Sequence, residues 1–124
     1  MAELIFRGGT IVTVDDDHRI THGDLAIADG VIVAVGGDYT PTGSDYTIVE
    51  VPGAIVMPGL IQAHVHTCQT LARGRADDLE LLDWLRNVIW PYEGALDALA
   101  LAASARLAMA ELLLGGTTAI LDMA

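Results

Sequence analysis

The feature that most constrains the fold is a nearly continuous apolar run, AIVMPGLIQAHVH, at residues 54–66. Only Pro58 and Gly59 interrupt it before two histidines close it. A half-exposed strand alternates polar and apolar residues, whereas a strand buried on both faces of a parallel sheet is apolar almost throughout. The run therefore predicts a buried strand that belongs to an α/β structure.

The residues before this run predict a different kind of structure. Residues 1–50 contain short segments in which β-branched residues alternate with Gly and Asp turn signals, namely ELIFRGGTIVTV, DLAIADG and VIVAVGG. Turns are predicted at DDDH (15–18) and ADG (28–30). Residues 15–18 also admit a cation site, but a solvated turn is the favoured interpretation. After a polar loop at 38–46, TIVEVPG resumes the strand pattern, so residues 1–55 predict an all-β domain.

Two helical segments follow the histidines. In DDLELLDWLRNVIW, residues 77–90, leucine and isoleucine recur at three- and four-residue spacings. This spacing predicts a helix with two aspartates at its start, where the helix dipole favours negative charge, and with its end at Pro91. A second helix, rich in alanine and leucine, is predicted from about Asp97 to Leu114 and stops at a Gly-Gly step.

The last segment, TTAILDMA at residues 117–124, reads as another buried strand. The order strand, helix, helix, strand over residues 56–124 predicts the opening unit of a parallel α/β structure. A single parallel pair leaves one face and its edges bare, and only further strands could cover them. We therefore expect the chain to be the front of a larger protein that continues beyond Ala124.

Composition excludes several classes of partner. The formal net charge is −11 and only six residues are Lys or Arg, which argues against nucleic acid and against anionic membranes. No apolar stretch reaches the roughly 20 residues needed to span a bilayer. The single Cys68 cannot form an internal disulfide, and the amino terminus lacks the pattern of an export signal. These features predict a soluble protein of the reducing cytoplasm.

His64 and His66 are the candidate metal ligands. Side chains alternate along a strand, so residues two apart point to the same face and two imidazoles can share one ion. Neutral imidazole is a good ligand for zinc and related metals. The alternative is a hydrogen-bonded structural pair, but the Pro-Gly step before the run and the strand-to-helix switch after it favour a metal site at the carboxyl end of the strand.

The segment VMPGLIQAHVHTCQTLARGRADDLELLDWLRNVIWPYE (56–93) and the later GGTTAILDM (115–123) resemble the metal-dependent amidohydrolase superfamily. Within it, the match is to the branch of triazine hydrolases and of S-adenosylhomocysteine, methylthioadenosine and 5′-deoxyadenosine deaminases. The resemblance covers essentially the whole chain, as the amino-terminal portion of such a protein. It implies an incomplete (β/α)8 TIM barrel at residues 56–124, containing strand 1, its helices and strand 2, preceded at residues 1–55 by part of a small β-sandwich.

The resemblance also implies roles for individual residues. His64 and His66 would bind one divalent metal ion, with Zn²⁺ favoured and Fe²⁺ as an alternative. Trp84 would line the substrate pocket, Glu93 would accept hydrogen bonds from ribose hydroxyls, and Gln69 would face the same pocket. The alternatives are that Trp84 packs in the core, that Glu93 is an ordinary surface carboxylate, and that Gln69 stabilises a turn.

Two further residues near the expected site are assigned other roles. A coordinating cysteine is not the family pattern, so Cys68 is not expected to bind the metal. Asp122, near the end of the last strand, is predicted to cap a helix or to pack rather than to face the interior of a barrel. The proton-transferring catalytic residues are unknown here and are expected beyond Ala124.

The predicted function is hydrolytic deamination of an adenosine-like nucleoside by the full-length parent, through a metal-activated water that displaces ammonia. The isolated chain is expected to be inactive. A triazine chlorohydrolase and a guanine or cytosine deaminase are alternatives within the superfamily, and a non-catalytic assembly module is an alternative outside it. The expected partners are a small-molecule substrate and, through exposed apolar faces, either a second copy or the missing carboxyl-terminal part.

Overall fold

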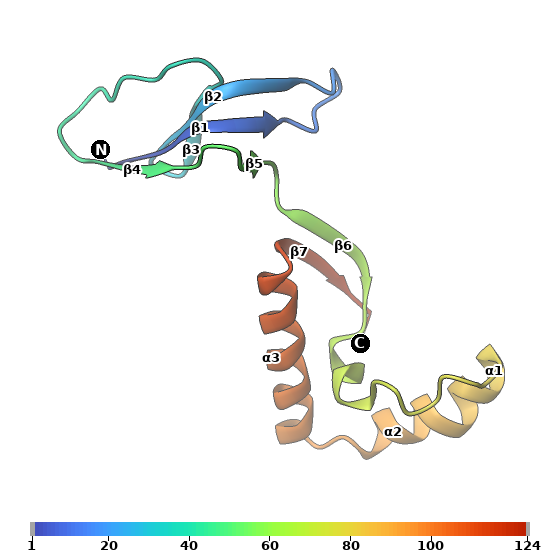
Figure 1. Ribbon diagram of the computed structural model, residues 1–124. Coiled ribbons are helices and arrows are strands. Elements are labelled where there is room, and N and C mark those ends of the chain that lie inside the picture. Colours follow the sequence, from blue (N-terminus) through green and yellow to red (C-terminus); the bar gives the residue numbers. More distant parts are fainter. Residues whose placement is uncertain (1, 124) are drawn as a thin grey trace. The chain divides into compact units, whose positions relative to one another are not determined.

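The computed structural model describes residues 2–123, which form two compact units. The first unit ends at Pro58 and the second begins at Gly59 (Figure 1). The first consists of strands alone, whereas the second combines a pair of parallel strands with helices. The chain is therefore an α/β protein with a mixed sheet.

The first unit is one five-stranded sheet in the order β3-β2-β1-β4, with β5 also paired to β1. Its strands are β1 (Glu3–Val12), β2 (Ile20–Ala28), β3 (Val31–Val35), β4 (Tyr46–Glu50) and β5 (Ile55–Val56). β2 pairs antiparallel with both β1 and β3, while β4 and β5 pair parallel with β1. The strands predicted from the alternation of β-branched residues and turn signals are confirmed.

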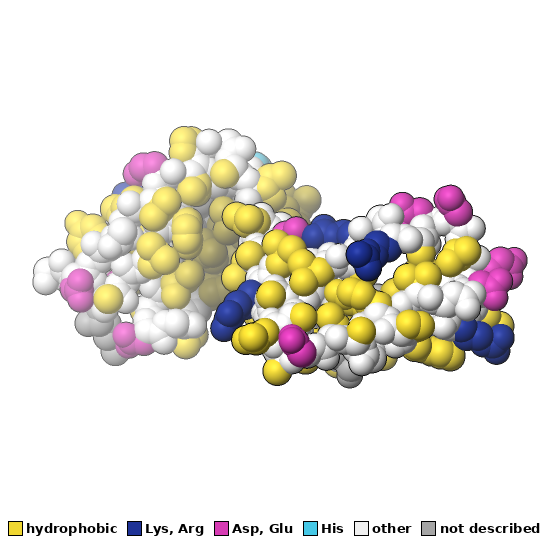
Figure 2. All heavy atoms as spheres, turned by 90° about the horizontal axis from the view of Figure 1, so that it is seen from below, with side chains coloured by type: hydrophobic (Ala, Val, Ile, Leu, Met, Phe, Trp, Pro, Cys, Tyr) yellow, Lys and Arg dark blue, Asp and Glu magenta, His cyan; other side chains and the backbone are white. Residues whose placement is uncertain are grey.

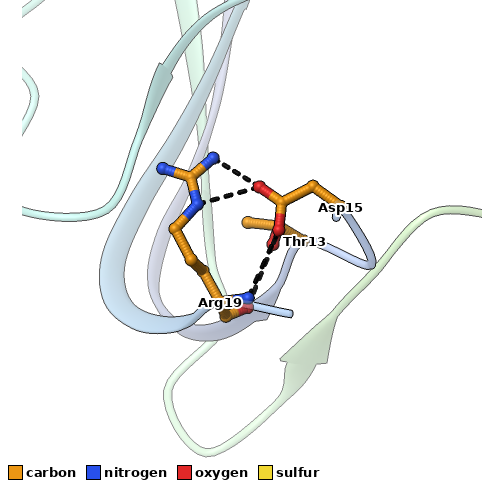
Figure 3. Close-up of polar contacts among 3 residues, drawn as sticks. All are labelled: Thr13, Asp15 and Arg19. Carbon is orange, nitrogen blue, oxygen red and sulfur yellow. Dashed lines mark hydrogen bonds and ion pairs between the residues drawn. The ribbon is translucent and has the colours of Figure 1, made fainter. Parts of the chain in front are cut away.

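Both predicted turns of this unit are confirmed. Asp29 and Gly30 join β2 to β3 with φ angles of 51° and 78°, the left-handed conformation that a tight hairpin requires. Between β1 and β2, the Asp15 carboxylate accepts hydrogen bonds from the Thr13 hydroxyl at 2.8 Å and from Arg19 Nε at 2.8 Å (Figure 3). These contacts lower the pKa of Asp15 to about 2, with the Arg19 side chain as the largest cause. The carboxylate at this turn is thus bonded within the turn itself.

Two buried carboxylates hold the polar loop at 38–46 against the sheet. Glu3 accepts hydrogen bonds from the Tyr39 hydroxyl at 2.9 Å and from the Thr42 backbone N–H at 3.0 Å. Asp24 accepts bonds from Arg7 Nε, at 3.2 Å, and from the Tyr39 N–H, at 3.1 Å. The Thr42 bonds lower the pKa of Glu3, and the N–H donors around Asp24 lower its pKa despite the opposing effect of burial.

The second unit is built on two parallel strands, β6 (Leu60–Val65) and β7 (Thr117–Asp122). A 3₁₀-helix, η1 (Thr67–Ala72), follows β6 directly, and the helix α3 (Ala98–Leu114) packs against η1 and β7 (Figure 1). The Asp97 carboxylate caps α3 by accepting a bond from the Ala100 N–H at 2.8 Å. The predicted strand-helix-strand order and the bounds of α3 are confirmed.

The prediction of a single buried strand across residues 54–66 is wrong in two respects. Residues Ile55–Val56 form β5, which pairs with β1, and a new strand starts only at Leu60, because Pro58 lacks the N–H that a continuing ladder would use. β6 and β7 are also largely exposed, with Ile61 75% and Leu121 58% accessible. Two strands and one packed helix leave the opposite face uncovered, and hydrophobic side chains occupy much of the surface in Figure 2.

The helix predicted over residues 77–90 also differs from the structure. It begins at Leu81 rather than at the aspartates, and it runs through α1 (Leu81–Trp84), a π-helical turn η2 (Leu85–Ile89) and α2 (Trp90–Ala95). Pro91 does not end it. The π-turn pairs the Trp90 N–H with the Leu85 carbonyl, and the proline then occupies the first turn of α2, where its missing N–H is tolerated.

A close contact explains why the Pro-Gly step and the Gly-Thr-Thr step occur together. A Cβ at Gly59 would lie 2.1 Å from Cγ2 of Thr118 and 2.7 Å from its Cβ, so only glycine fits beside that residue. The Leu60 N–H also donates to the Gly116 carbonyl at 2.9 Å, which aligns the starts of β6 and β7. Within the described part of the chain, no helix is long and apolar enough to cross a membrane.

Candidate metal centre

The side chains of His64, in β6, and of His66, just after the end of β6, converge. Nε2 of His64 lies 3.2 Å from Nε2 of His66, and the ring centroids are 5.0 Å apart at an interplanar angle of 72°. His64 is exposed and His66 is half-buried. The prediction that these side chains share one face of the strand is confirmed.

This spacing fits a shared ion. Two Zn–N bonds of about 2.0–2.1 Å at a tetrahedral angle place the two nitrogens about 3.3–3.4 Å apart. The observed 3.2 Å separation of the two Nε2 atoms is close to that value. The same distance also permits one neutral ring to donate an Nε2–H bond to the other, so the spacing fits both a shared ion and a hydrogen-bonded pair.

The described residues offer two candidate ligands at this place. Among residues 2–123 there is no group of three or more His, Cys, Asp or Glu side chains arranged to hold a metal. A structural zinc site has four protein ligands and a catalytic one has three. Further protein ligands would therefore have to come from outside the described residues.

The backbone that follows His66 is held from two sides. Asp122, at the end of β7, accepts bonds from the Thr67 backbone N–H at 3.2 Å and from the Thr67 hydroxyl. The hydroxyl of Ser104, on α3, lies 2.8 Å from the Thr67 carbonyl oxygen and 2.9 Å from that of Cys68. Asp122 was predicted to cap a helix or to pack; it is not the N-cap of η1, which is His66, but it accepts bonds from Thr67, the first residue of η1. The Thr67 bonds lower the pKa of its carboxyl group.

Beside the histidines lies a cleft of about 630 Å³. Three predicted residues line it: His66 at the start of η1, Gln69 in η1 and Trp84 in α1. Glu93 does not line this cleft but is half-buried next to it, where its Oε1 accepts a bond from the Gln69 amide at 2.8 Å. The structure thus brings three of the five predicted site residues to one cleft. Of the other two, Glu93 contacts it through Gln69 and His64 through His66.

The environment of Cys68 disfavours a role as a metal ligand. Its buried thiol donates to the same Oε1 of Glu93 at 3.5 Å, and burial together with that carboxylate raises the pKa of the thiol. Metal binding by cysteine requires the thiolate, which a raised pKa disfavours. The Tyr92 hydroxyl donates to the Cys68 carbonyl at 3.3 Å, so η1 is also tied to α2.

Sequence reasoning missed Ser104. It is completely buried on α3, and its hydroxyl serves backbone carbonyls 36 and 37 residues away. The signal available in the sequence was a serine in the stretch ALALAASARLAMA, which apart from Arg106 is otherwise apolar. That signal shows that a polar atom needs a partner, but it does not show which one.

Comparison with known proteins identifies the family. Residues 55–124 match the model of the amidohydrolase family, so the chain belongs to it. The chain is 39% identical, over 99% of its length, to a 5′-deoxyadenosine deaminase of Methanosarcina barkeri, and covers 28% of that protein. It is 45% identical, over 84% of its length, to a 5-methylthioadenosine/S-adenosylhomocysteine deaminase of Halalkalibacterium halodurans, and covers 24% of that protein. The chain therefore spans about a quarter of the length of these relatives.

Solved structures agree with the fold of the chain. An atrazine chlorohydrolase from Arthrobacter aurescens, crystallised with zinc, superimposes with a TM-score of 0.83 at 30% identity, over 98% of this chain and 28% of that one. A guanine deaminase from C. acetobutylicum superimposes with a TM-score of 0.78 at 26% identity, over 95% of this chain and 29% of that one.

Proposed function

We propose that this chain is the amino-terminal part of a metal-dependent aminohydrolase that removes an amino group, as ammonia, from an adenosine-like nucleoside. The observation that carries the proposal is the 3.2 Å approach of Nε2 of His64 to Nε2 of His66 beside a cleft of ring-binding size. The names of the similar deaminases support a nucleoside of the 5′-deoxyadenosine, methylthioadenosine or S-adenosylhomocysteine kind.

His64 and His66 would hold one divalent ion. Imidazole nitrogens suit zinc and iron alike, and zinc is favoured because the similar atrazine chlorohydrolase was crystallised with it. The ion would supply a water activated for attack at near-neutral pH. The residues that complete the coordination and move the proton would lie outside residues 2–123.

The other predicted site residues would bind the substrate. Trp84 offers an aromatic face in the cleft, against which a purine ring can pack. Both hydrogen bonds to Glu93 engage Oε1, so Oε2 is available to accept a bond from a ribose hydroxyl. Gln69 would hold Glu93 in place rather than bind the sugar itself, because its amide already donates to that carboxylate.

The proposal extends to the fold of the whole protein. The strand pair β6-β7 with α3 would be the start of a (β/α)8 barrel, and the first unit would be part of a small β-sandwich. Apolar side chains exposed on β6, β7 and α3 support a covering by further structure, either the remainder of the barrel or a second copy. The single, buried Cys68 supports a cytoplasmic location.

A second candidate is hydrolysis of a substituted triazine ring. TM-scores of 0.83 to 0.85 to triazine hydrolases favour it. The sequence identity to those structures, 28–30%, is lower than the 39% and 45% to the 5′-deoxyadenosine and 5-methylthioadenosine/S-adenosylhomocysteine deaminases. Both reactions displace a substituent from a ring carbon, so the histidine pair does not distinguish them.

A chimera tests the proposal and separates the two candidates. Residues 1–124 would replace the corresponding segment of the Methanosarcina barkeri deaminase, and the product would be assayed with 5′-deoxyadenosine and with atrazine. We expect ammonia release from the nucleoside, abolished by His64→Ala, and a raised KM in Glu93→Gln. A folded, zinc-loaded chimera that acts on neither compound would contradict the proposal, and one that acts only on atrazine would favour the second candidate.

A further inference from the structure

Asp122 lies where the two strands of the second unit end together. It is the register partner of Val65, the residue between the two histidines, and the Met123 N–H donates to the Val65 carbonyl at 2.8 Å. The strand ladder thus fixes the carboxylate within reach of the chain that leaves β6. This placement depends on the pairing of β6 with β7 and not on local sequence.

Both carboxylate oxygens of Asp122 are used on one residue, Thr67. Oδ1 accepts the backbone N–H at 3.2 Å and Oδ2 accepts the hydroxyl. Thr67 directly follows His66, whose backbone angles of φ −123° and ψ 87° belong to neither a regular strand nor a helix. The direction of the His66 ring therefore depends on how the peptide after it is held.

Ser104 holds the same turn from the side of α3, since its hydroxyl lies at hydrogen-bond distance from the carbonyl oxygens of Thr67 and Cys68. The N–H, the hydroxyl and the carbonyl of Thr67 are then all bonded to groups from other elements. A metal ligand that is fixed in this way need not be ordered when the ion binds, so less binding energy is lost.

We infer that Asp122 is a positioning residue for the His66 imidazole. It fixes the turn from β6 into η1 so that Nε2 of His66 and Nε2 of His64 face one ion. This inference rests on the proposed function, because it assumes that the histidine pair binds metal. A competing explanation is that any negative charge near the pair attracts a cation. The two explanations differ for asparagine, which keeps the shape and the hydrogen bonds but not the charge.

The test is a Zn²⁺ titration of the 124-residue chain, followed through the side-chain ¹H–¹⁵N NMR signals of His64 and His66. We expect Asp122→Ala to weaken zinc binding about tenfold, in line with the loss of an outer-shell partner. Asp122→Asn should stay within about twofold of wild type, because its amide can accept the Thr67 N–H and donate to the Thr67 hydroxyl. Asp78→Ala, an exposed carboxylate of the same unit, serves as the charge-matched control and should bind as wild type does.

Equal affinity in wild type and Asp122→Ala would overturn the inference, and so would an equal loss in Asp122→Asn and Asp122→Ala. If Asp122→Ala does not fold, Thr67→Val, which removes only the hydroxyl donor, should weaken binding about threefold, and unchanged affinity there would overturn the inference. A wild-type chain whose histidine nitrogens do not respond to zinc would instead contradict the proposed function.

Discussion

The two units of this chain differ in where their polar side chains find partners. In the first, the buried carboxylates of Glu3 and Asp24 accept hydrogen bonds from the unit's own loop. In the second, Asp122 and Ser104 likewise bond within the unit, to Thr67, whereas the imidazoles of His64 and His66 face one another at the end of a strand. Polar groups bonded to the rest of their unit stabilise its fold, whereas a pair that bonds to itself can exchange that bond for a shared ligand.

The units also differ in which hydrophobic side chains they bury. The first unit buries Ile5, Ile11 and Ala26 along β1 and β2, while large side chains of β3, such as Ile32, remain exposed. The second unit buries Ile89 together with smaller residues such as Ala108, while large side chains on β6, β7 and α3 remain exposed. We expect the first unit to respond most to loss of a buried carboxylate and the second to respond most to changes in close packing.

Loss of a buried carboxylate should give the largest effect. Asp24→Ala leaves the Arg7 guanidinium and the N–H groups of Gly8 and Tyr39 without their acceptor, and should reduce the free energy of unfolding by about 3 kcal/mol. The measurement is a urea titration followed by the backbone NMR signals of β1. Asp38→Ala, which removes an exposed carboxylate from the loop at 38–46, is the control and should change the free energy of unfolding little. An equal loss of unfolding free energy in both variants would show that the buried carboxylate stabilises the first unit no more than an exposed one does.

Overpacking at the start of β6 should come next. Gly59→Ala forces a Cβ onto Thr118 and should cost about 2 kcal/mol, measured by tryptophan fluorescence, which reports on the second unit because Trp84 and Trp90 both lie there. Thr118→Gly in the same chain should recover most of the loss. Gly94→Ala, with nothing within 4 Å, should be neutral or gain up to about 1 kcal/mol. A neutral Gly59→Ala would show that the contact does not constrain this strand pair.

Removal of the buried hydroxyl of Ser104 should have a smaller effect. Ser104→Ala deprives the carbonyls of Thr67 and Cys68 of a donor and should lower the unfolding free energy of the second unit by about 1 kcal/mol in the same fluorescence assay. It should also speed hydrogen exchange in η1 more than in β1. Identical exchange in the two places would mean that the hydroxyl does not specifically hold η1.

The smallest effect is expected at the exposed pair of Asp15 and Arg19. Arg19→Gln should raise the pKa of Asp15 from about 2 toward its ordinary 3.8, as followed by carboxyl ¹³C NMR. Because the folded-state pKa is lowered, the contribution of this pair to stability is present above pH 4 and is lost as the pH falls toward 2. Solvent screening keeps that contribution small. An Asp15 pKa that does not move would show that Arg19 is not its main partner.

Local signals predicted the elements whose stabilising contacts are also local. Asp97 and the Gly-Gly step marked both ends of α3, and turn residues marked the hairpin at Asp29. Alternation along the strand was sufficient to predict that His64 and His66 converge. The π-turn at Leu85–Ile89 was missed because its cause is a shift in backbone pairing that no residue type signals. The Asp122 and Ser104 contacts join residues 36 to 55 positions apart, and therefore required the pairing of β6 with β7 to be known.

The imidazoles of His64 and His66 are proposed to bind one ion together. Zinc K-edge X-ray absorption of the zinc-loaded chain tests this binding directly, with His22→Ala as a control that should leave the spectrum unchanged. We expect scattering from two imidazoles with Zn–N distances of about 2.0–2.1 Å, and its loss in His64→Ala. A spectrum with oxygen neighbours alone, or with a sulfur at about 2.3 Å from Cys68, would contradict it.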